Sequence, residues 1–291
     1  MKKLILLITM VSFTVQAQNL TVSSGKSWTV EKTGSVKIAG NLINNGTFTL
    51  NSDADEFSSV IVDYDNNGSG SSTGNIDYNR YVNAEGTDEW DLIGSPLDGV
   101  SIYTFVTNNT SGTATLATNG SAYAVGEYDN TTDTWTNYTT ATAGVDEAAG
   151  NFDIGKGYQM ASVSGGTGLL KFTGTAASTT QTQAIINNDA ANANAGRRWN
   201  LIANPFPSYV QGNTNADGTN NFLTVNADKL DDSFEAVYGY DADGTGYTVY
   251  NNASSTLRLA PGQAFMVASD NTVSDNVSFT TAMRTVVGGD D

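Results

Sequence analysis

The sequence predicts an all-β protein, with a short N-terminal β-solenoid or meander followed by two tandem homologous antiparallel β-sandwich domains. Two observations carry this prediction. Apolar residues alternate with polar ones over short stretches, separated by clusters of Gly, Asn, Asp, Ser and Thr, and this pattern is typical of many short strands joined by turns. In addition, a Trp-x-Leu-Ile-x-x-Pro motif occurs twice, and other motifs follow each copy in the same order.

The first 17 residues predict a secretory signal peptide. Lys2 and Lys3 give a basic start, an apolar run follows, and Val15 and Ala17 lie three residues and one residue before a cleavage point at Gln18. The apolar run is too short to span a bilayer comfortably. We therefore expect an exported chain, secreted or at the cell surface, without membrane insertion.

Residues 18–74 predict a β-solenoid-like N-terminal region and a linker. Apolar pairs at positions i and i+2 recur at roughly 8 to 12 residues, a spacing that fits solenoid rungs or tight hairpins, and we favour the solenoid. The polar, Gly- and Ser-rich tract of residues 63–74 is the candidate linker. The apolar pairs are Leu20/Val22, Trp28/Val30, Val36/Ile38 and Phe48/Leu50.

Residues 75–190 and 191–291 predict two copies of one sandwich domain. Residues 90–96 (Trp-Asp-Leu-Ile-Gly-Ser-Pro) return as residues 199–205 (Trp-Asn-Leu-Ile-Ala-Asn-Pro). Each copy has about 105 residues, which suits one antiparallel sandwich. We expect Trp90 and Trp199 to be equivalent and buried.

Three aromatic positions recur with the same spacing in both copies, next to Asp-rich turns. Each set predicts a hairpin with cross-strand aromatic pairs, which stabilise hairpins by about 0.2–1 kcal/mol. Packing alone explains such rings, and the alternative is a platform on which sugar rings stack. The candidate ligand-binding residues are Tyr128, Trp135 and Tyr138 in the first copy and Tyr240, Tyr247 and Tyr250 in the second.

A half calcium loop is the strongest candidate for a cofactor site, and no cofactor other than calcium is expected. Asp63, Asp65 and Asn67 stand at its positions 1, 3 and 5, followed by Gly68 at the sharp turn. Position 12 is Gly74 rather than the bidentate Glu of an EF-hand. Residues 213–218 and 241–246 are weaker matches, and plain turn chemistry is the alternative for each of these segments.

Composition restricts the chemistry that the chain can perform. It has no His and no Cys, which excludes His-dependent triads, His-ligated zinc and disulfides. A formal net charge of −17 argues against nucleic-acid partners. Lys156 becomes Gln263 in the second copy, so a shared catalytic lysine is excluded. Two-carboxylate glycan hydrolysis remains, with candidates in two acidic clusters that solvated surface explains equally well: Glu85, Asp88, Glu89 and Asp91, and Asp231, Asp232 and Glu235.

Three motifs carry a family resemblance: Asn79-Arg80-Tyr81, residues 90–96, and residues 261–265 (Pro-Gly-Gln-Ala-Phe). Through them the chain resembles extracellular, multi-domain surface proteins of Bacteroidota, of the kind exported by the type IX secretion system. The resemblance covers most of residues 20–285 and implies a secreted or cell-surface location and an adhesive or ligand-binding role. Such proteins usually end in a C-terminal sorting domain, whereas this sequence stops at Asp291, so we expect either a fragment or another export route.

The expected function is an exported, non-catalytic module that binds an extracellular glycan or protein, or that spaces a module that does. The alternative is a secreted, carboxylate-dependent glycan hydrolase. Retention on a polysaccharide without release of reducing ends would distinguish the first from the second.

Overall fold

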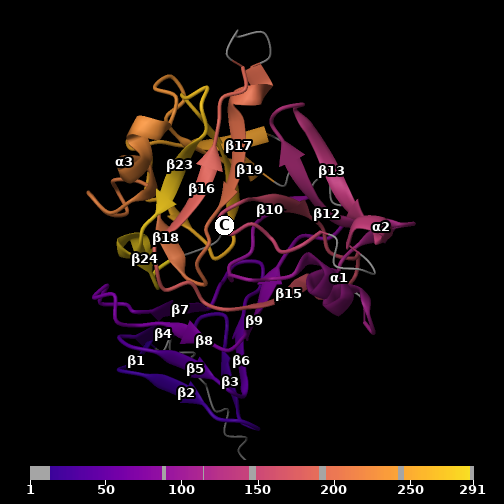
Figure 1. The fold of residues 1–291 in the computed structure, drawn as a ribbon, viewed down its shortest axis with the longest axis vertical. Coiled ribbons are helices and arrows are strands. Elements are labelled where there is room, and N and C mark those ends of the chain that lie inside the picture. The colour runs from indigo at the N-terminus through magenta and orange to yellow at the C-terminus, as the bar shows by residue number, and fades with distance from the viewer. Residues whose placement is uncertain are drawn as a thin grey trace, which may run out of the picture.

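The computed structural model describes residues 14–86, 90–113, 115–143, 149–189, 195–241 and 246–288. It confirms the all-β fold class, with strands arranged in several sheets. The N-terminal region lies at one end of the long axis, and the two repeats lie side by side at the other end (Figure 1). We call residues 75–190 repeat 1 and residues 191–291 repeat 2.

The N-terminal region is a solenoid rather than a meander, because its strands pair in parallel. Each rung places successive strands on three different sides, and equivalent positions stack in register, for example Leu20 with Leu42 and Trp28 with Phe48. The three sides consist of β1 (Thr14–Ala17), β4 (Ser35–Ile38) and β7 (Ser59–Val62); of β2 (Leu20–Val22), β5 (Leu42–Asn44) and β8 (Ser72–Thr73); and of β3 (Ser27–Val30), β6 (Thr47–Asn51) and β9 (Ile76–Tyr81).

Alternating apolar residues fill the solenoid interior, with Ile38, Leu42 and Leu50 fully buried. The tract of residues 63–74, which we predicted as a linker, instead forms a corner of the solenoid and contains β8. Gly74 makes this corner possible, because its φ is +78° and an added Cβ would collide with the carbonyl oxygen of Asn44. Residues 14–17 of the predicted signal peptide form β1, and residues 1–13 lie outside the described part of the chain.

The two repeats have the same strand order, as the internal sequence repeat predicts. One sheet of repeat 1 runs β10-β14-β12-β13, and its counterpart in repeat 2 runs β17-β22-β19-β20. Each repeat also has a second antiparallel pair, β9 with β15 and β16 with β23. Although β16 falls within residues 75–190, it pairs with a strand of repeat 2. In repeat 1 the strands are β10 (Asp91–Ile93), β11 (Thr118–Asn119), β12 (Ala122–Asp129), β13 (Thr134–Thr139), β14 (Tyr158–Met160) and β15 (Leu169–Gly174). Strand β16 (Gln181–Ile185) precedes residue 191. The strands that follow it are β17 (Trp199–Ala203), β18 (Tyr209–Gln211), β19 (Val237–Asp241), β20 (Gly246–Tyr250), β21 (Arg258–Leu259), β22 (Ala264–Ala268), β23 (Asp275–Phe279) and β24 (Arg284–Thr285).

Each repeat also contains one short helix that the strand pattern did not predict. Ser101 caps α1 (Ile102–Thr110) and Asn221 caps α3 (Phe222–Asn226), each accepting a hydrogen bond from the backbone N–H three residues later. Asn109 and Asn226, at equivalent places, each exchange two hydrogen bonds with the backbone of the neighbouring strand. The remaining helical turns are α2 (Thr140–Ala143), η1 (Ala195–Arg198), η2 (Ala227–Lys229) and η3 (Thr281–Met283).

The repeats meet through reciprocal contacts. Ile93 bridges to Gln263, and its equivalent Ile202 bridges to Lys156, the equivalent of Gln263. Likewise the N–H of Gly94 donates to the carbonyl of Gly262 at 2.8 Å, and that of Ala203 donates to Gly155 at 2.8 Å. Reciprocal contacts of this kind define an isologous interface. The two repeats are therefore related as in a two-fold symmetric dimer, inside one chain.

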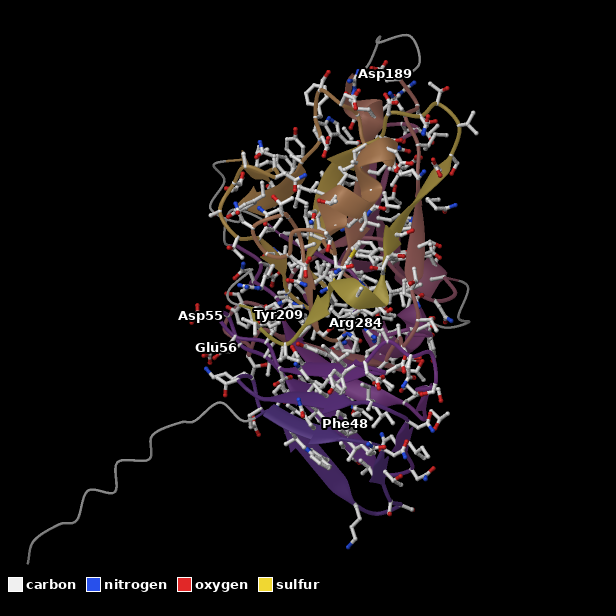
Figure 2. All side chains as sticks on the ribbon, turned by 90° about the vertical axis from the view of Figure 1, so that its left-hand side faces the viewer. Phe48, Asp55, Glu56, Asp189, Tyr209 and Arg284 are labelled. Atoms are coloured by element: carbon white, nitrogen blue, oxygen red, sulfur yellow. The ribbon has the colours of Figure 1, made fainter. Side chains whose placement is uncertain are left out.

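Buried arginines join the solenoid to the repeats. Arg80 stacks on Phe57 at 4.1 Å and donates through Nε to the carbonyl of Pro261 at 2.8 Å. Arg284 donates through Nη1 to the carbonyl of Val62 at 2.7 Å and through Nη2 to that of Asp63 at 3.0 Å. Figure 2 shows Arg284 at the boundary between repeat 2 and the solenoid. These bonds satisfy both arginines where they are buried, as buried charges require.

Candidate functional site

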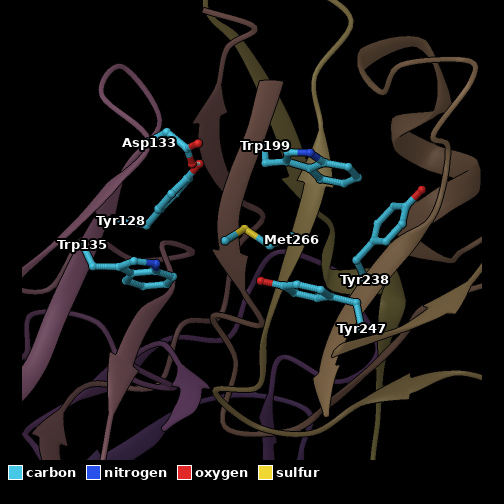
Figure 3. A pocket seen from close by; sticks show the side chains of 7 residues that line it. All are labelled: Tyr128, Asp133, Trp135, Trp199, Tyr238, Tyr247 and Met266. Atoms are coloured by element: carbon cyan, nitrogen blue, oxygen red, sulfur yellow. Dashed lines mark hydrogen bonds between the residues drawn. The ribbon is translucent and has the colours of Figure 1, made fainter. Parts of the chain in front are cut away.

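A cavity of about 200 Å³ opens between the two repeats and is lined mainly by aromatic side chains (Figure 3). Both repeats contribute, so neither could form it alone. Repeat 1 supplies Tyr128, Asp133 and Trp135 from the β12–β13 hairpin, and repeat 2 supplies Trp199, Tyr238, Tyr247 and Met266 from β17, β19, β20 and β22. We call this the aromatic cavity.

Cross-strand pairing positions the two most exposed rings. Trp135 lies opposite Tyr128 in the β12–β13 register, with ring centroids 5.2 Å apart, and Tyr247 lies opposite Tyr240 at the same distance. Trp135 and Tyr247 are equivalent positions of the two repeats, 38% and 46% exposed. Figure 3 shows them reaching toward one another from opposite sides of the cavity. The cavity therefore lies where the pseudo-two-fold relation brings equivalent hairpins together.

The repeat 2 wall is built around Trp199. Its ring contacts Tyr238 edge-on, with centroids 4.6 Å apart, and Phe234 at 5.7 Å. Trp199 and its equivalent Trp90 are both half-buried, packed against the edges of clusters of buried apolar residues. The prediction that both are buried was wrong, since in Trp199 one side of the ring faces the cavity instead of a core.

Asp133 is the carboxylate of the cavity. Its Oδ1 accepts a hydrogen bond from the Tyr128 hydroxyl at 2.8 Å, and the carbonyl of Gly196 lies 3.1 Å from the same hydroxyl. Asp133 has a φ of +58°, a backbone conformation that a non-glycine residue rarely adopts. Burial, and then the hydrogen bond to Asp133, raise the pKa of Tyr128 above its usual value. The Tyr128 hydroxyl therefore stays protonated near neutral pH and remains a donor.

Several polar ring tips at the cavity lack partners within the described protein. Nε1 of Trp135, Nε1 of Trp199 and the Tyr238 hydroxyl form no hydrogen bond to any described residue. None of these three groups is among the buried polar atoms without a partner, so each is accessible from outside the protein. A ligand in the cavity would thus meet flat apolar ring faces together with hydrogen-bond donors.

The six aromatic residues singled out in the sequence have different roles. Tyr128, Trp135 and Tyr247 line the aromatic cavity, whereas Tyr240 packs in the small apolar cluster between the repeats. Tyr138 packs against the core of repeat 1 and Tyr250 against that of repeat 2. Sequence reasoning missed four lining residues, because their approach depends on how the repeats pack: Asp133, Trp199, Tyr238 and Met266.

In the half calcium loop the side chains bond to the loop's own backbone. The Asp63 carboxylate accepts from the N–H of Gly68 at 2.9 Å and of Gly70 at 3.1 Å. Asn67 accepts from Ser69 and donates to Asp65 at 3.0 Å. Within the described ranges no group of three or more acidic, His or Cys side chains is placed to hold a metal. These bonds give the loop a structural role, and calcium binding there stays a prediction.

The weaker calcium matches differ in what the structure describes of them. Asn213 is buried and donates to the carbonyls of Asn251 and Ser255, so it ties two loops together. Asp217 accepts hydrogen bonds from the backbone of Thr219 and Asn220, and these bonds hold its pKa below its usual value. Residues 242–245 lie outside the described residues.

None of the described carboxylate candidates for hydrolysis is a lining residue of the aromatic cavity. Asp91 accepts two hydrogen bonds from Asn83, at 2.6 and 2.7 Å, and Asp231 pairs with Arg198 at 2.9 Å. Asp232 is exposed, and Asp88 and Glu89 lie outside the described residues. Among the described residues that line the cavity, Asp133 is the one carboxylate.

No helix in the described ranges is long and apolar enough to cross a membrane.

Comparison with known proteins identifies a family but no individual curated protein or solved structure. No curated protein matches the chain, and no solved structure does. One family matches residues 5–290, nearly the whole sequence. The chain therefore belongs to the family described as "Domain of unknown function (DUF8693)".

Proposed function

We propose that this chain is an exported or cell-surface, non-catalytic binding module, and that its ligand is a glycan held in the aromatic cavity. One observation carries the proposal. Trp135 and Tyr247, from equivalent hairpins, converge on a single cavity that also presents a carboxylate and unpartnered ring donors.

The chemistry of the lining suits a sugar. A pyranose ring has apolar C–H faces and a rim of hydroxyl groups, and Trp and Tyr likewise combine an apolar body with a polar tip. The hydroxyl groups can accept from Nε1 of Trp135 and Trp199 and donate to the Asp133 carboxylate, a charge-assisted bond. A volume of about 200 Å³ has room for one such ring.

Binding is better supported than hydrolysis. Glycosidases generally use two carboxylates, about 5–5.5 Å apart or about 6.5–9.5 Å apart, on either side of the scissile bond. The described lining supplies Asp133, which is already bonded to the Tyr128 hydroxyl. Its oxygens are thereby suited to orient hydroxyl groups of a bound sugar.

The proposed location rests on the sequence. The signal-like first 17 residues, the acidic composition and the resemblance to exported surface proteins of Bacteroidota support secretion or cell-surface display. A glycan ligand would be met in that compartment.

A polysaccharide panel tests the proposal, scored for retention of the protein and for released reducing ends. We expect retention without release, and a loss of about 10-fold or more in affinity for Trp135→Ala and for Tyr247→Ala, which corresponds to about 1.4 kcal/mol. Tyr64→Ala is the matched control, because it removes a comparably exposed ring from the solenoid. Release of reducing ends, retention by no polysaccharide, or unchanged binding in both cavity variants would each contradict the proposal.

A further inference from the structure

A second cavity, of about 330 Å³, adjoins the aromatic cavity. Tyr128 lines both, so the two cavities share this residue. The second cavity lies between the β12–β13 hairpin and strands β16 and β17. Its lining is mainly polar and includes Glu127, Asn130, Lys156, Gln183 and Asn200. We call it the polar cavity.

Hydrogen bonds hold much of this lining in place. Asn130 donates through Nδ2 to Asn200 Oδ1 and to the carbonyl of Ile186, both at 3.0 Å, and accepts from Asn188 at 2.9 Å. Lys156 pairs with Glu127 at 2.6 Å. A preorganised polar wall of this kind can bind hydroxyl groups without first losing side-chain freedom.

Gln183 is a lining residue with unused hydrogen-bonding capacity. Its Nε2 donates to the carbonyl of the adjacent Ala184 at 3.2 Å, and its Oε1 accepts no hydrogen bond from a described residue. Gln183 is half-buried, whereas its neighbour Thr182 is exposed on the opposite side of the strand. Gln183 can therefore both donate to and accept from a ligand.

The polar cavity breaks the pseudo-two-fold relation. Leu170 pairs with Arg80 in β9, and the equivalent Val277 pairs with Gln183 in β16, so Arg80 is the counterpart of Gln183. Arg80 is fully buried, stacked on Phe57 of the solenoid. On the Arg80 side of the repeats, the solenoid therefore packs where the polar cavity lies on the Gln183 side. A ligand that leaves the aromatic cavity thus has a polar extension on the Gln183 side.

We propose that the two cavities are adjacent subsites of one oligosaccharide site. The aromatic cavity takes one sugar ring by stacking, and the polar cavity takes the neighbouring sugar through its hydroxyl groups. The inference rests on the proposed glycan-binding function and adds the length and charge class of the ligand.

The charges around the two cavities and on the whole chain favour a neutral sugar as the ligand. Lys156 is already paired with Glu127, and Asp129 and Asp133 lie beside the two cavities. The whole chain carries a formal charge of −17, which repels anionic chains. The ligand is therefore a neutral oligosaccharide of at least two units rather than a uronic-acid or sulfated one.

Calorimetric titration with oligosaccharides of one to four units tests the inference. The probes are β-1,4-linked gluco- and manno-oligosaccharides, α-1,4-linked gluco-oligosaccharides, and oligogalacturonate as the anionic series. For at least one neutral series we expect affinity to rise about 10-fold from one unit to two, about 1.4 kcal/mol. Gln183→Ala should remove this gain and leave monosaccharide affinity within about 2-fold, and Thr182→Ala should change neither.

Failure of the inference differs from failure of the proposed function. Two results would remove the second subsite and leave the glycan site. In the first, Trp135→Ala abolishes binding but affinity does not depend on the length of the oligosaccharide. In the second, Gln183→Ala lowers the affinity for one unit and for two units by the same factor. Tighter binding of oligogalacturonate than of every neutral series would contradict the charge class. If the unaltered protein binds none of these sugars, the proposed function itself falls.

Discussion

Trp135 and Tyr247 occupy equivalent positions in the two repeats, and both line one cavity. In a duplicated chain, equivalent residues usually face separate, repeated surfaces. Here the reciprocal contacts at Ile93 and Ile202 bring the two hairpins together across a pseudo-two-fold axis. The tandem repeat would by itself suggest two sites and a gain in avidity, whereas the packing predicts one composite site.

Removing the exposed cavity rings should affect binding far more than folding. Trp135 and Tyr247 are 38% and 46% exposed and belong to no cluster of buried apolar residues. Trp135→Ala and Tyr247→Ala therefore remove mainly a cross-strand ring pair, which contributes about 0.2–1 kcal/mol. We expect each variant to lower the free energy of unfolding by less than about 1 kcal/mol in urea titrations. A loss above about 3 kcal/mol would show that the rings are core residues, and weaker binding would then reflect unfolding.

A core phenylalanine provides the contrasting case. Phe265 is fully buried and packs edge-on against Phe222, with centroids 5.2 Å apart. Phe265→Ala should cost about 3–5 kcal/mol of unfolding free energy, as large-to-small core substitutions do. Trp199→Ala should cost less, because Trp199 is half-buried and faces the cavity. Equal losses for the two variants would contradict the placement of Trp199.

Buried tyrosines predict a loss of stability at alkaline pH. Burial raises the pKa of Tyr128, Tyr138 and Tyr158 above the ordinary value of about 10. Above that pH the unfolded chain ionises while the folded tyrosines stay neutral, so the folded state loses relative stability. Thermal midpoints should be level from pH 7 to 9 and should fall above about pH 10. Tyr158→Phe should fall less steeply, and an identical slope would contradict the assignment.

The half calcium loop predicts a calcium-dependent midpoint. An ion that binds Asp63, Asp65 and Asn67 only in the folded state would raise the thermal midpoint in millimolar calcium relative to chelator. Asp63→Ala should remove that difference and should also destabilise the loop, because Gly68 and Gly70 lose their acceptor. Identical midpoints in calcium and chelator would leave the loop with its structural role alone.

Most of the architecture follows from short-range sequence patterns. Alternating pairs such as Leu20/Val22 identify strands, and the repeated motif at Trp90 and Trp199 gives two domains of equal topology. The helices α1 and α3 were missed, since nine and five residues are too few for helical periodicity to stand out against strand alternation. The corner of residues 63–74 has the composition of a linker, yet stacking on the previous rung makes it part of the solenoid.

The site was only half predictable for a different reason. Tyr128, Trp135 and Tyr247 are visible as repeated aromatic positions next to turns. Asp133 resembles any turn residue, and Trp199 and Met266 resemble core residues until the packing of repeat 1 on repeat 2 is known. Motif spacing reports equivalence between the repeats, but it carries no information on which surfaces meet.

The number of ligands bound per chain distinguishes one composite site from two separate sites. The measurement is calorimetric titration of the full chain, of Trp135→Ala and of Tyr247→Ala with the shortest oligosaccharide that the panel identifies. One composite site predicts one ligand per chain, with both variants weakening that same binding event. Two ligands per chain, with each variant removing one of them, would show two independent sites and contradict the account.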